Sequence, residues 1–443
     1  MNIVTRLKTE AEQAIAHAYQ ALPEAAAGRS LRAAAFARFE ATGLPHRRVE
    51  AYKYTDLKAL VRRFLPPAGM TAPLALAALR QQQSEASDTV RLVIVDGRYR
   101  PDLSDAVPAG VRVSALADVL AEGRADLIAA LSGPAIADGD PVLALNAALM
   151  SDGVVIEVTA GVTVAPAITL THVVTADDPV SVHTRSLVVL NAGAALGLIE
   201  RHVGAHPGHQ RTDVLHLVVG DGGAFEHVVA KTDATALDLS TLTATVGADA
   251  RVTSFALVTA GEITRRQHFV RMAGDRSVLT LKGASLLNAE MHADTTLVVE
   301  HDSLACQSRE LFRHVIDDAA HGVFQGKVIV RPGAQKTDGK MASNALLLSD
   351  GAEMDNKPEL EIFADDVACG HGATCGEIDE RPIFYLMSRG LPRTEAEALL
   401  IQSFVGEVVD SVGEGPLASQ AEALRDAFTA SIERWLAARR TSA

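Results

Sequence analysis

The residues with the clearest chemical potential lie in the stretch DVACGHGATCGEID, residues 366–379. It contains Cys369, His371 and Cys375, which are two of the chain's three cysteines and one of its fifteen histidines. Thiolate and imidazole are both ligands for iron and zinc, and residues i and i+2 of an extended chain share a face. The spacing therefore predicts that Cys369 and His371 can reach one metal ion together.

Packing, redox chemistry and structural zinc binding are the alternatives for this stretch. Cys369 and Cys375 could be small buried residues that fill a corner of a sheet, and packing explains Cys375 most readily. A redox pair would lack the CxxC spacing, and a closed zinc site needs four ligands where the stretch offers three. We expect Gly370, Gly372 and Gly376 to interrupt regular strand geometry. We interpret the stretch as half of a metal site that a second subunit completes.

The composition excludes several classes of protein. A formal net charge of −14 argues against unspecific nucleic-acid binding, which needs a basic face. An aromatic content of 4% argues against a sugar-binding groove or a base-stacking platform. Three cysteines do not make a disulfide framework, and neither a membrane span nor a signal peptide is recognisable. We therefore expect a cytoplasmic protein.

Strand-length apolar runs dominate residues 153–378 and include VVIEV, SLVVL, VLTLKG and TTLVVEH. Gly-Ala pairs recur at spacings of 18 to 50 residues, beginning at Gly193, Gly223, Gly247, Gly283, Gly333, Gly351 and Gly372. A loose repeat of this length favours a parallel β-helix, in which each turn buries its apolar face against the next. An antiparallel sandwich is the alternative.

Helical patterns flank the strands. We predict an N-terminal helical and mixed α/β region at residues 1–150, a β-helix core at 151–380 and a C-terminal helical region at 381–443. Ser30 is predicted to cap one helix, and Thr394 with Glu397 to form a capping box for another. The predicted fold class is mainly β.

The segment GAQKTDGKM, residues 333–341, does not meet the requirements of a phosphate-binding loop. Five residues separate its glycines, and Met341 follows Lys340 where Ser or Thr is needed. No nucleotide site is therefore predicted. His314 and His321 are further candidates, although a histidine on a strand is more often structural. Cys306 is given no role.

Two stretches resemble the SufD family of the SUF system for iron–sulfur cluster assembly. The resemblance is dense over residues 324–390, which include the sequence CGHGAT, and it is looser through the other strands and the C-terminal helices. The second stretch is RRVEAYKYTDL, residues 47–57, in which Tyr52 stands where Trp is common. Gly372 follows His371 directly, which favours SufD over its paralogue SufB, where an acidic residue is typical.

The resemblance implies a right-handed parallel β-helix. It also implies two partners: SufB, which pairs with the end of the β-helix, and the ATPase SufC, which docks on the C-terminal helices. His371 would be the main cluster-assembly residue and Cys369 a weaker one, both as metal ligands shared with SufB. The segment that begins at residue 381 would bind SufC, with Phe384, Tyr385, Arg389 and Gly390 as the contact residues.

The hypothesis that follows is a non-catalytic scaffold subunit of a SufBCD-type complex. No tightly bound cofactor is expected in the isolated chain, and iron or an iron–sulfur cluster is expected transiently in the complex. Without SufB, a homodimer through the exposed strand edge is expected. A structural platform that only recruits the ATPase is one alternative, and a β-helix polysaccharide hydrolase or lyase is another.

Overall fold

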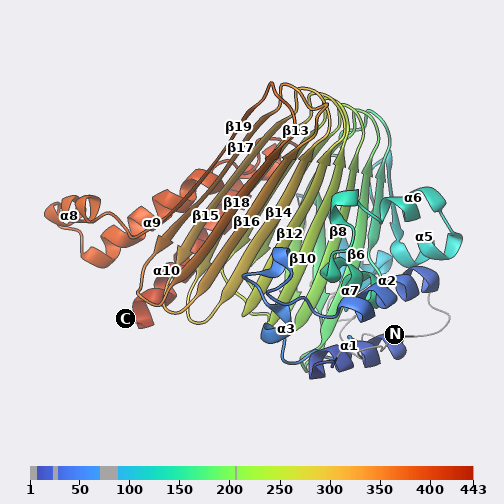
Figure 1. Cartoon of the computed structure of the whole chain (residues 1–443), viewed down its shortest axis with the longest axis horizontal. Helices are drawn as coiled ribbons and strands as arrows, with labels where there is room; N and C mark the ends of the chain where they lie inside the picture. The colour runs from blue at the N-terminus through green and yellow to red at the C-terminus, as the bar shows by residue number, and fades with distance from the viewer. Residues whose placement is uncertain (1–6, 23–27, 70–87, 205–206, 443) are drawn as a thin grey trace.

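The computed structural model describes residues 7–22, 28–69, 88–204 and 207–442, which form a stack of strands with helices along its sides (Figure 1). The helices before the main run of strands are α1 (Glu10–Gln20), α2 (Arg29–Thr42), α3 (Leu57–Leu60), α5 (Leu116–Glu122), α6 (Ala125–Ala130) and α7 (Pro141–Leu149). Those after it are α8 (Glu380–Ser388), α9 (Arg393–Val409) and α10 (Ala421–Ser442).

The strands form two sheets. In spatial order the first sheet contains β19 (Ala368–Gly376), β17 (Asp338–Leu347), β15 (Gln307–Ile316), β13 (Val278–Leu287), β11 (Arg251–Val258), β9 (Ala224–Lys231), β7 (Ala195–Gly204), β5 (Ile168–Val174), β1 (Val90–Val95) and β2 (Arg98–Tyr99). The second contains β18 (Glu353–Ile362), β16 (His321–Val330), β14 (His292–His301), β12 (Ile263–Met272), β10 (Leu237–Val246), β8 (Gln210–Val219), β6 (Ser181–Leu190), β4 (Val154–Val158) and β3 (Val111–Ala115).

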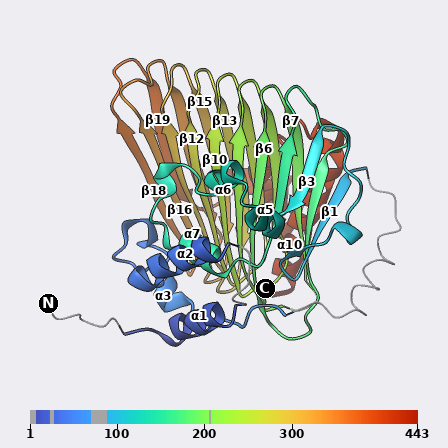
Figure 2. The ribbon, with the colours of Figure 1, turned by 90° about the vertical axis from the view of Figure 1, so that its right-hand side faces the viewer.

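From β4 to β19 the chain alternates between the sheets, so each turn adds one strand to each, and neighbouring strands within a sheet are parallel. The turns stack in register: Val219 aligns with Leu190 on one side and with Val246 on the other. Residues of both sheets belong to one apolar core, so the two sheets enclose a common interior. Figure 2 shows the strands side by side along the stack, from β19 to β1. The prediction of a mainly β chain with a parallel β-helix and helical flanks is confirmed.

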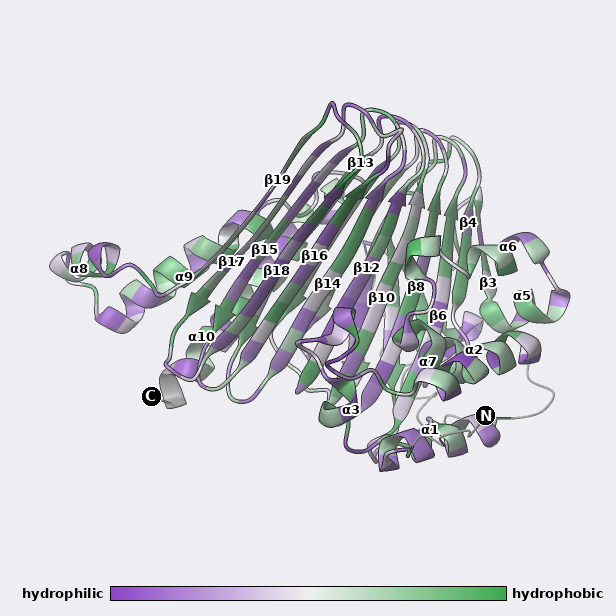
Figure 3. Cartoon of the chain, viewed as in Figure 1, coloured by the Kyte–Doolittle hydropathy of each residue, from purple (hydrophilic) through white to green (hydrophobic). Residues whose placement is uncertain are grey.

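The interior of the β-helix is apolar along one side and polar along the other. Strand β8 illustrates the change, because Leu215 and Leu217 belong to the apolar core whereas Arg211 and Asp213 on the same strand face do not. Apolar and polar residues alternate along many strands (Figure 3), as expected where one face is interior. Stacking these faces removes them from water, which is the main stabilising contribution in such a fold.

The Gly-Ala pairs mark turns at five of their seven positions. Gly193, for example, lies in a turn with φ of 68°, a conformation that glycine adopts without a steric penalty. The pairs that begin at Gly283 and Gly372 lie inside strands β13 and β19 instead. The loose period in the sequence arises partly because the motif occurs in both places.

The segment RRVEAYKYTDL holds the N-terminal region against the outer face of the second sheet. The guanidinium carbon of Arg265 lies 4.1 Å from the centre of the Tyr52 ring, and Arg265 pairs with Asp294. The Tyr52 hydroxyl donates a hydrogen bond to Asp140 at 2.7 Å, and Thr55 donates to Asp294. Burial raises the pKa of Tyr52 well above its usual value, so the phenol stays neutral and can donate. This stretch is therefore structural.

Helices α9 and α10 pack on the outer face of the first sheet. Phe428 of α10 packs on Phe255 of β11 with ring centroids 5.1 Å apart, and Trp435 belongs to the same cluster. The loop between α9 and α10 is held by the buried carboxylate of Glu226 on β9. This carboxylate accepts hydrogen bonds from the backbone N–H groups of Gly413, Gly415 and Leu417 at 2.8, 3.0 and 2.8 Å. One charged side chain thus anchors the start of the last helix.

Both predicted helix caps are wrong. Helix α2 begins at Arg29 with Gly28 as its N-cap, so Ser30 lies inside the first turn. Helix α9 begins at Arg393 after Pro392, and no side chain caps it. Glu397 instead pairs with Arg393 and with Arg439 of α10, because these two cations lie within reach of its carboxylate.

We predict that Glu226→Gln lowers the free energy of unfolding of the C-terminal helices by about 2 kcal/mol, because an amide NH₂ cannot accept the N–H groups that the lost oxygen accepted. Urea unfolding followed by the fluorescence of Trp435, the single tryptophan, would measure the change. The matched control is Glu290→Gln, in an exposed turn. Equal midpoints for the two variants would contradict the anchoring role.

Candidate functional site

The candidate site lies on the last turn of the β-helix. Strands β18 and β19 end the two sheets, and each pairs with one neighbouring strand, β16 and β17 respectively. Nearly all residues of β19 are exposed. A terminal strand of this kind has a row of backbone N–H and C=O groups without a strand partner, which can pair with another chain.

Strand β19 places the two predicted ligands, Cys369 and His371, on one face, together with Cys375. Cys369 aligns with Gly339, His371 with Met341 and Cys375 with Ala345. Met341 belongs to the apolar interior, so the face that carries His371 continues the interior of the β-helix out to its open end. The strand is regular from Ala368 to Gly376. The expectation that its glycines interrupt it is therefore wrong, because in-register pairing with β17 holds them extended.

Regular geometry brings the two predicted ligands near each other and leaves Cys375 further away. At about 3.3 Å per residue, the backbones of Cys369 and His371 lie about 7 Å apart, whereas those of His371 and Cys375 lie about 13 Å apart. Within the described ranges, no group of three or more His, Cys, Asp or Glu side chains is placed to hold a metal ion. The end turn thus offers Cys369 and His371 as a pair, with Cys375 further along the strand.

The environments of the cysteines differ. Cys369 is half-buried, and burial raises the pKa of its thiol, as does the nearby Asp338. A methyl group would fit between Gly339 and Cys369, because a Cβ at Gly339 would lie 3.6 Å from the Cys369 sulfur, an ordinary van der Waals distance. Cys375 is exposed, although partial burial still raises its pKa. Cys306 is fully buried beside Ser277, which donates a hydrogen bond to its sulfur at 3.3 Å. We interpret Cys306 as a packing residue.

The other two candidate histidines lie away from the exposed face of the end turn. His314 is buried beside Phe324, and burial lowers its pKa to about 4, so the imidazole is neutral. His321 lies on the second sheet, where its Nε2 is 2.9 Å from a carboxylate oxygen of Asp355. Neither is brought together with His371. The contact with Asp355 explains His321, whereas both ring nitrogens of His314 are buried without a hydrogen-bond partner among the described residues.

Helix α8 and the two residues after it include the residues predicted to bind a partner. It projects away from the β-helix beyond α9 (Figure 1). Ile383 is buried, whereas Phe384 and Tyr385 are 75% and 56% exposed. The Arg389 guanidinium lies 5.1 Å from the centre of the Tyr385 ring, and Gly390 ends the segment with φ of 93°. Two large exposed aromatic side chains therefore lie next to each other in the sequence of α8.

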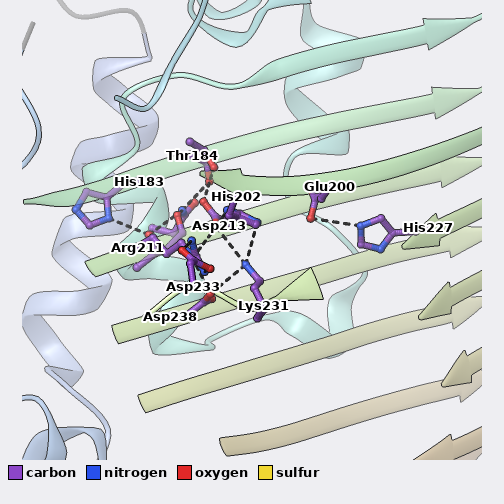
Figure 4. Close-up of polar contacts among 12 residues, drawn as sticks. His183, Thr184, Glu200, His202, Arg211, Asp213, His227, Lys231, Asp233 and Asp238 are labelled. Atoms are coloured by element: carbon purple, nitrogen blue, oxygen red, sulfur yellow. Dashed lines mark hydrogen bonds and ion pairs between the residues drawn. The ribbon is translucent and has the colours of Figure 1, made fainter. Parts of the chain in front are cut away.

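Sequence reasoning missed a buried charged network in the polar side of the interior (Figure 4). Lys231 lies 3.0 Å from both Asp238 and the Nε2 of His202, and Arg211 pairs with Asp238 and Asp233. Burial, together with these two cations, holds the pKa of His202 well below its usual value. Each of the two cations faces a carboxylate, so neither charge is buried alone. Only the alignment of successive turns, which the sequence does not give, would have brought these residues together.

No helix in the described parts of the chain is long and apolar enough to cross a membrane.

Comparison with known proteins identifies the family. The profile described as "SUF system FeS cluster assembly, SufBD core domain" matches residues 172–404, and "SufBD protein N-terminal region" matches residues 24–170. The chain is 32% identical to "Iron-sulfur cluster assembly protein SufD" of Escherichia coli, over 86% of this chain and 88% of that protein. It is 29% identical to an iron-sulfur cluster assembly SufBD family protein of Synechocystis, over 86% of each chain.

A shorter match is also to a SufD protein. The SufD protein of Bacillus subtilis is 33% identical over 34% of each chain. The core profile covers the run of strands from β5 to the end turn and continues into α9. The chain therefore belongs to the SufBD family, as a SufD-type protein of the SUF system for iron–sulfur cluster assembly.

Proposed function

We propose that the chain is a scaffold subunit of a SufBCD-type complex and that clusters are built where its end turn meets a SufB-type partner. The observation that carries this proposal is the pair of Cys369 and His371 on one face of an exposed terminal strand. Two protein ligands leave iron coordinatively incomplete, so the partner would supply the others. Iron and sulfide are then substrates that pass through the site, and the isolated chain holds no tightly bound cofactor.

The end turn also suits pairing with a second β-helix. Backbone groups of β18 and β19 can extend both sheets by strand addition. Ile362 and Phe363, at the end of β18, are 40% and 58% exposed and would be buried in such an interface. The same edge would pair with a second copy of this chain when SufB is absent, which gives a homodimer.

Helix α8 supports the second contact, with a SufC-type ATPase. Phe384 and Tyr385 offer the aromatic anchors that dominate protein interfaces, and Arg389 stacks on Tyr385. In this proposal the partner's ATP turnover moves the docked helices and opens the cluster site. This chain is then a non-catalytic subunit, and the complex works in the cytoplasm.

The exposed aromatic pair on α8 also favours a second candidate function, a structural platform whose only task is to recruit the ATPase. The two candidates differ in what they require of the end turn. A scaffold for cluster assembly needs the His371 imidazole, whereas a platform does not.

We predict that His371→Ala leaves the complex assembled but lowers cluster formation at least about tenfold, because the mutation removes a ligand from a site that has few. The measurement is iron and acid-labile sulfide per complex after co-expression with SufB-type and SufC-type partners. His17→Ala, exposed on α1, is the control. Wild-type iron and sulfide in the His371→Ala complex would reject the cluster-assembly site and favour the platform.

We further predict that replacing Phe384 and Tyr385 together with Ala weakens binding of the ATPase about 100-fold, since each truncation removes an exposed aromatic anchor. Titration of the purified ATPase into each variant would give the affinities. Leu304→Ala, which removes an exposed apolar side chain from a turn of the β-helix, serves as the control. An unchanged affinity in the double variant would place the ATPase contact elsewhere on the chain.

A further inference from the structure

A line of polar side chains crosses the outer face of the last three strands of the first sheet. Arg313 on β15, Asn344 on β17 and Thr374 on β19 align in register. The Arg313 guanidinium donates a hydrogen bond to Asn344 Oδ1 at 2.6 Å, and the Asn344 amide donates one to Thr374 Oγ1 at 2.7 Å. Thr374 lies between His371 and Cys375 in the chain, so the line ends on the strand that carries the candidate site.

The other end of the line is helix α9. Arg313 pairs with Glu407, and its guanidinium carbon lies 4.8 Å from the centre of the Phe404 ring. Helix α9 contacts α8, and Arg393 of α9 donates a hydrogen bond to Glu380 of α8 at 3.0 Å. A continuous set of contacts therefore runs from the helix with the exposed aromatic pair to the end strand.

Arg313 and Asn344 can pass a displacement from one strand to the next, because their hydrogen bonds fix the orientation of both side chains. The planar guanidinium of Arg313 contacts a carboxylate, an amide oxygen and an aromatic face at once, so its orientation is fixed by three partners. Its side chain is 15% exposed, against 57% for that of Glu407. Strand β19 pairs with a single strand. A side-chain contact from β17 therefore contributes a larger part of its ordering than the same contact would contribute to an interior strand, which has two neighbours.

We propose that Arg313 and Asn344 are positioning residues that couple helix α9 to strand β19. Displacement of α9 shifts the Arg313 guanidinium, Asn344 follows, and Thr374 changes the placement of the strand face that carries His371. This coupling rests on the proposed function in one respect: His371 is the group whose position it controls.

A residue that only stabilised its own turn would not show this coupling. Glu407→Gln removes the negative charge opposite Arg313 without altering β17 or β19. If the line of contacts couples α9 to β19, this change on α9 must alter the hydrogen exchange of β19. Asn344→Ala interrupts the line in the middle, and Thr374→Val removes the last acceptor with little change in side-chain volume.

Hydrogen exchange measured by mass spectrometry on the full-length chain tests the coupling. We expect exchange in the β19 peptide to be about threefold faster or more in Asn344→Ala and in Thr374→Val, and measurably faster in Glu407→Gln. The double variant Glu407→Gln with Asn344→Ala should match Asn344→Ala alone, because the line is already interrupted. Thr374→Val keeps the test decisive if Asn344→Ala fails to fold.

Two controls isolate the effect. Lys340→Ala changes the same face of β17 four residues from Asn344, at the position that aligns with Gly370, and Ser403→Ala changes an exposed position on α9. Both should leave β19 exchange at the wild-type rate. If Glu407→Gln leaves it unchanged, or if the effects of the double variant add, then Asn344 acts locally and the coupling is overturned.

The exchange measurement does not depend on cluster formation, so the two proposals fail separately. Wild-type clusters in His371→Ala would reject the function while leaving the exchange result standing. In co-expressed complexes we expect Thr374→Val to lower iron and sulfide several-fold while the ATPase stays bound. Full cluster yield in that variant, beside a loss in His371→Ala, would overturn the positioning role.

Discussion

In-register stacking of parallel turns is the constraint on which the rest of this molecule depends. Each turn presents an apolar face that it cannot bury alone, and the next turn covers it. Alignments such as Leu190 with Val219 and Val246 keep that face continuous. A stack of this kind must also stop, and its last turn has a neighbour on one side. The open end is thus a consequence of the way the fold is stabilised, and it is where Cys369 and His371 lie.

The helical regions dock along the sides of the stack. Tyr52 and Arg265 fix the N-terminal segment to the second sheet, and Glu226 fixes the α9–α10 loop to the first. These anchors are buried polar groups with several partners each, so their geometry is specific. Helix α8 projects from the side, while the end turn remains exposed. The arrangement leaves two separate surfaces for two partners, joined through Arg313 and α9.

Much of this architecture could be predicted from the sequence. Short apolar runs separated by turns predicted the β-helix, and the spacing of Cys369 and His371 placed them correctly on one strand face. Local details failed where tertiary contacts override propensity. Glu397 pairs with Arg393 and Arg439 rather than closing a capping box, and β19 stays regular through its glycines because β17 holds it.

What could not be predicted depends on contacts between turns. The link from Asn344 to Thr374 joins residues 30 positions apart, and no local pattern around either residue indicates it. The same is true of Lys231 and Asp238, whose pairing requires knowing where each turn begins. Sequence patterns report which residues face inward but not which inward residues meet. The candidate ligands were found because both lie on one strand.

The buried charged network has a consequence for how the turns align. A slip of one residue between neighbouring strands would turn apolar side chains outward, but a slip of two residues would keep every side chain on its original face. Hydrophobic burial alone therefore discriminates weakly against a slip of two residues. Arg211 on β8 aligns directly with Asp238 on β10, and a two-residue slip would separate these two buried charges, so that each would lose one of its ion-pair partners. The buried ion pairs therefore stabilise the native register over the register that is shifted by two residues.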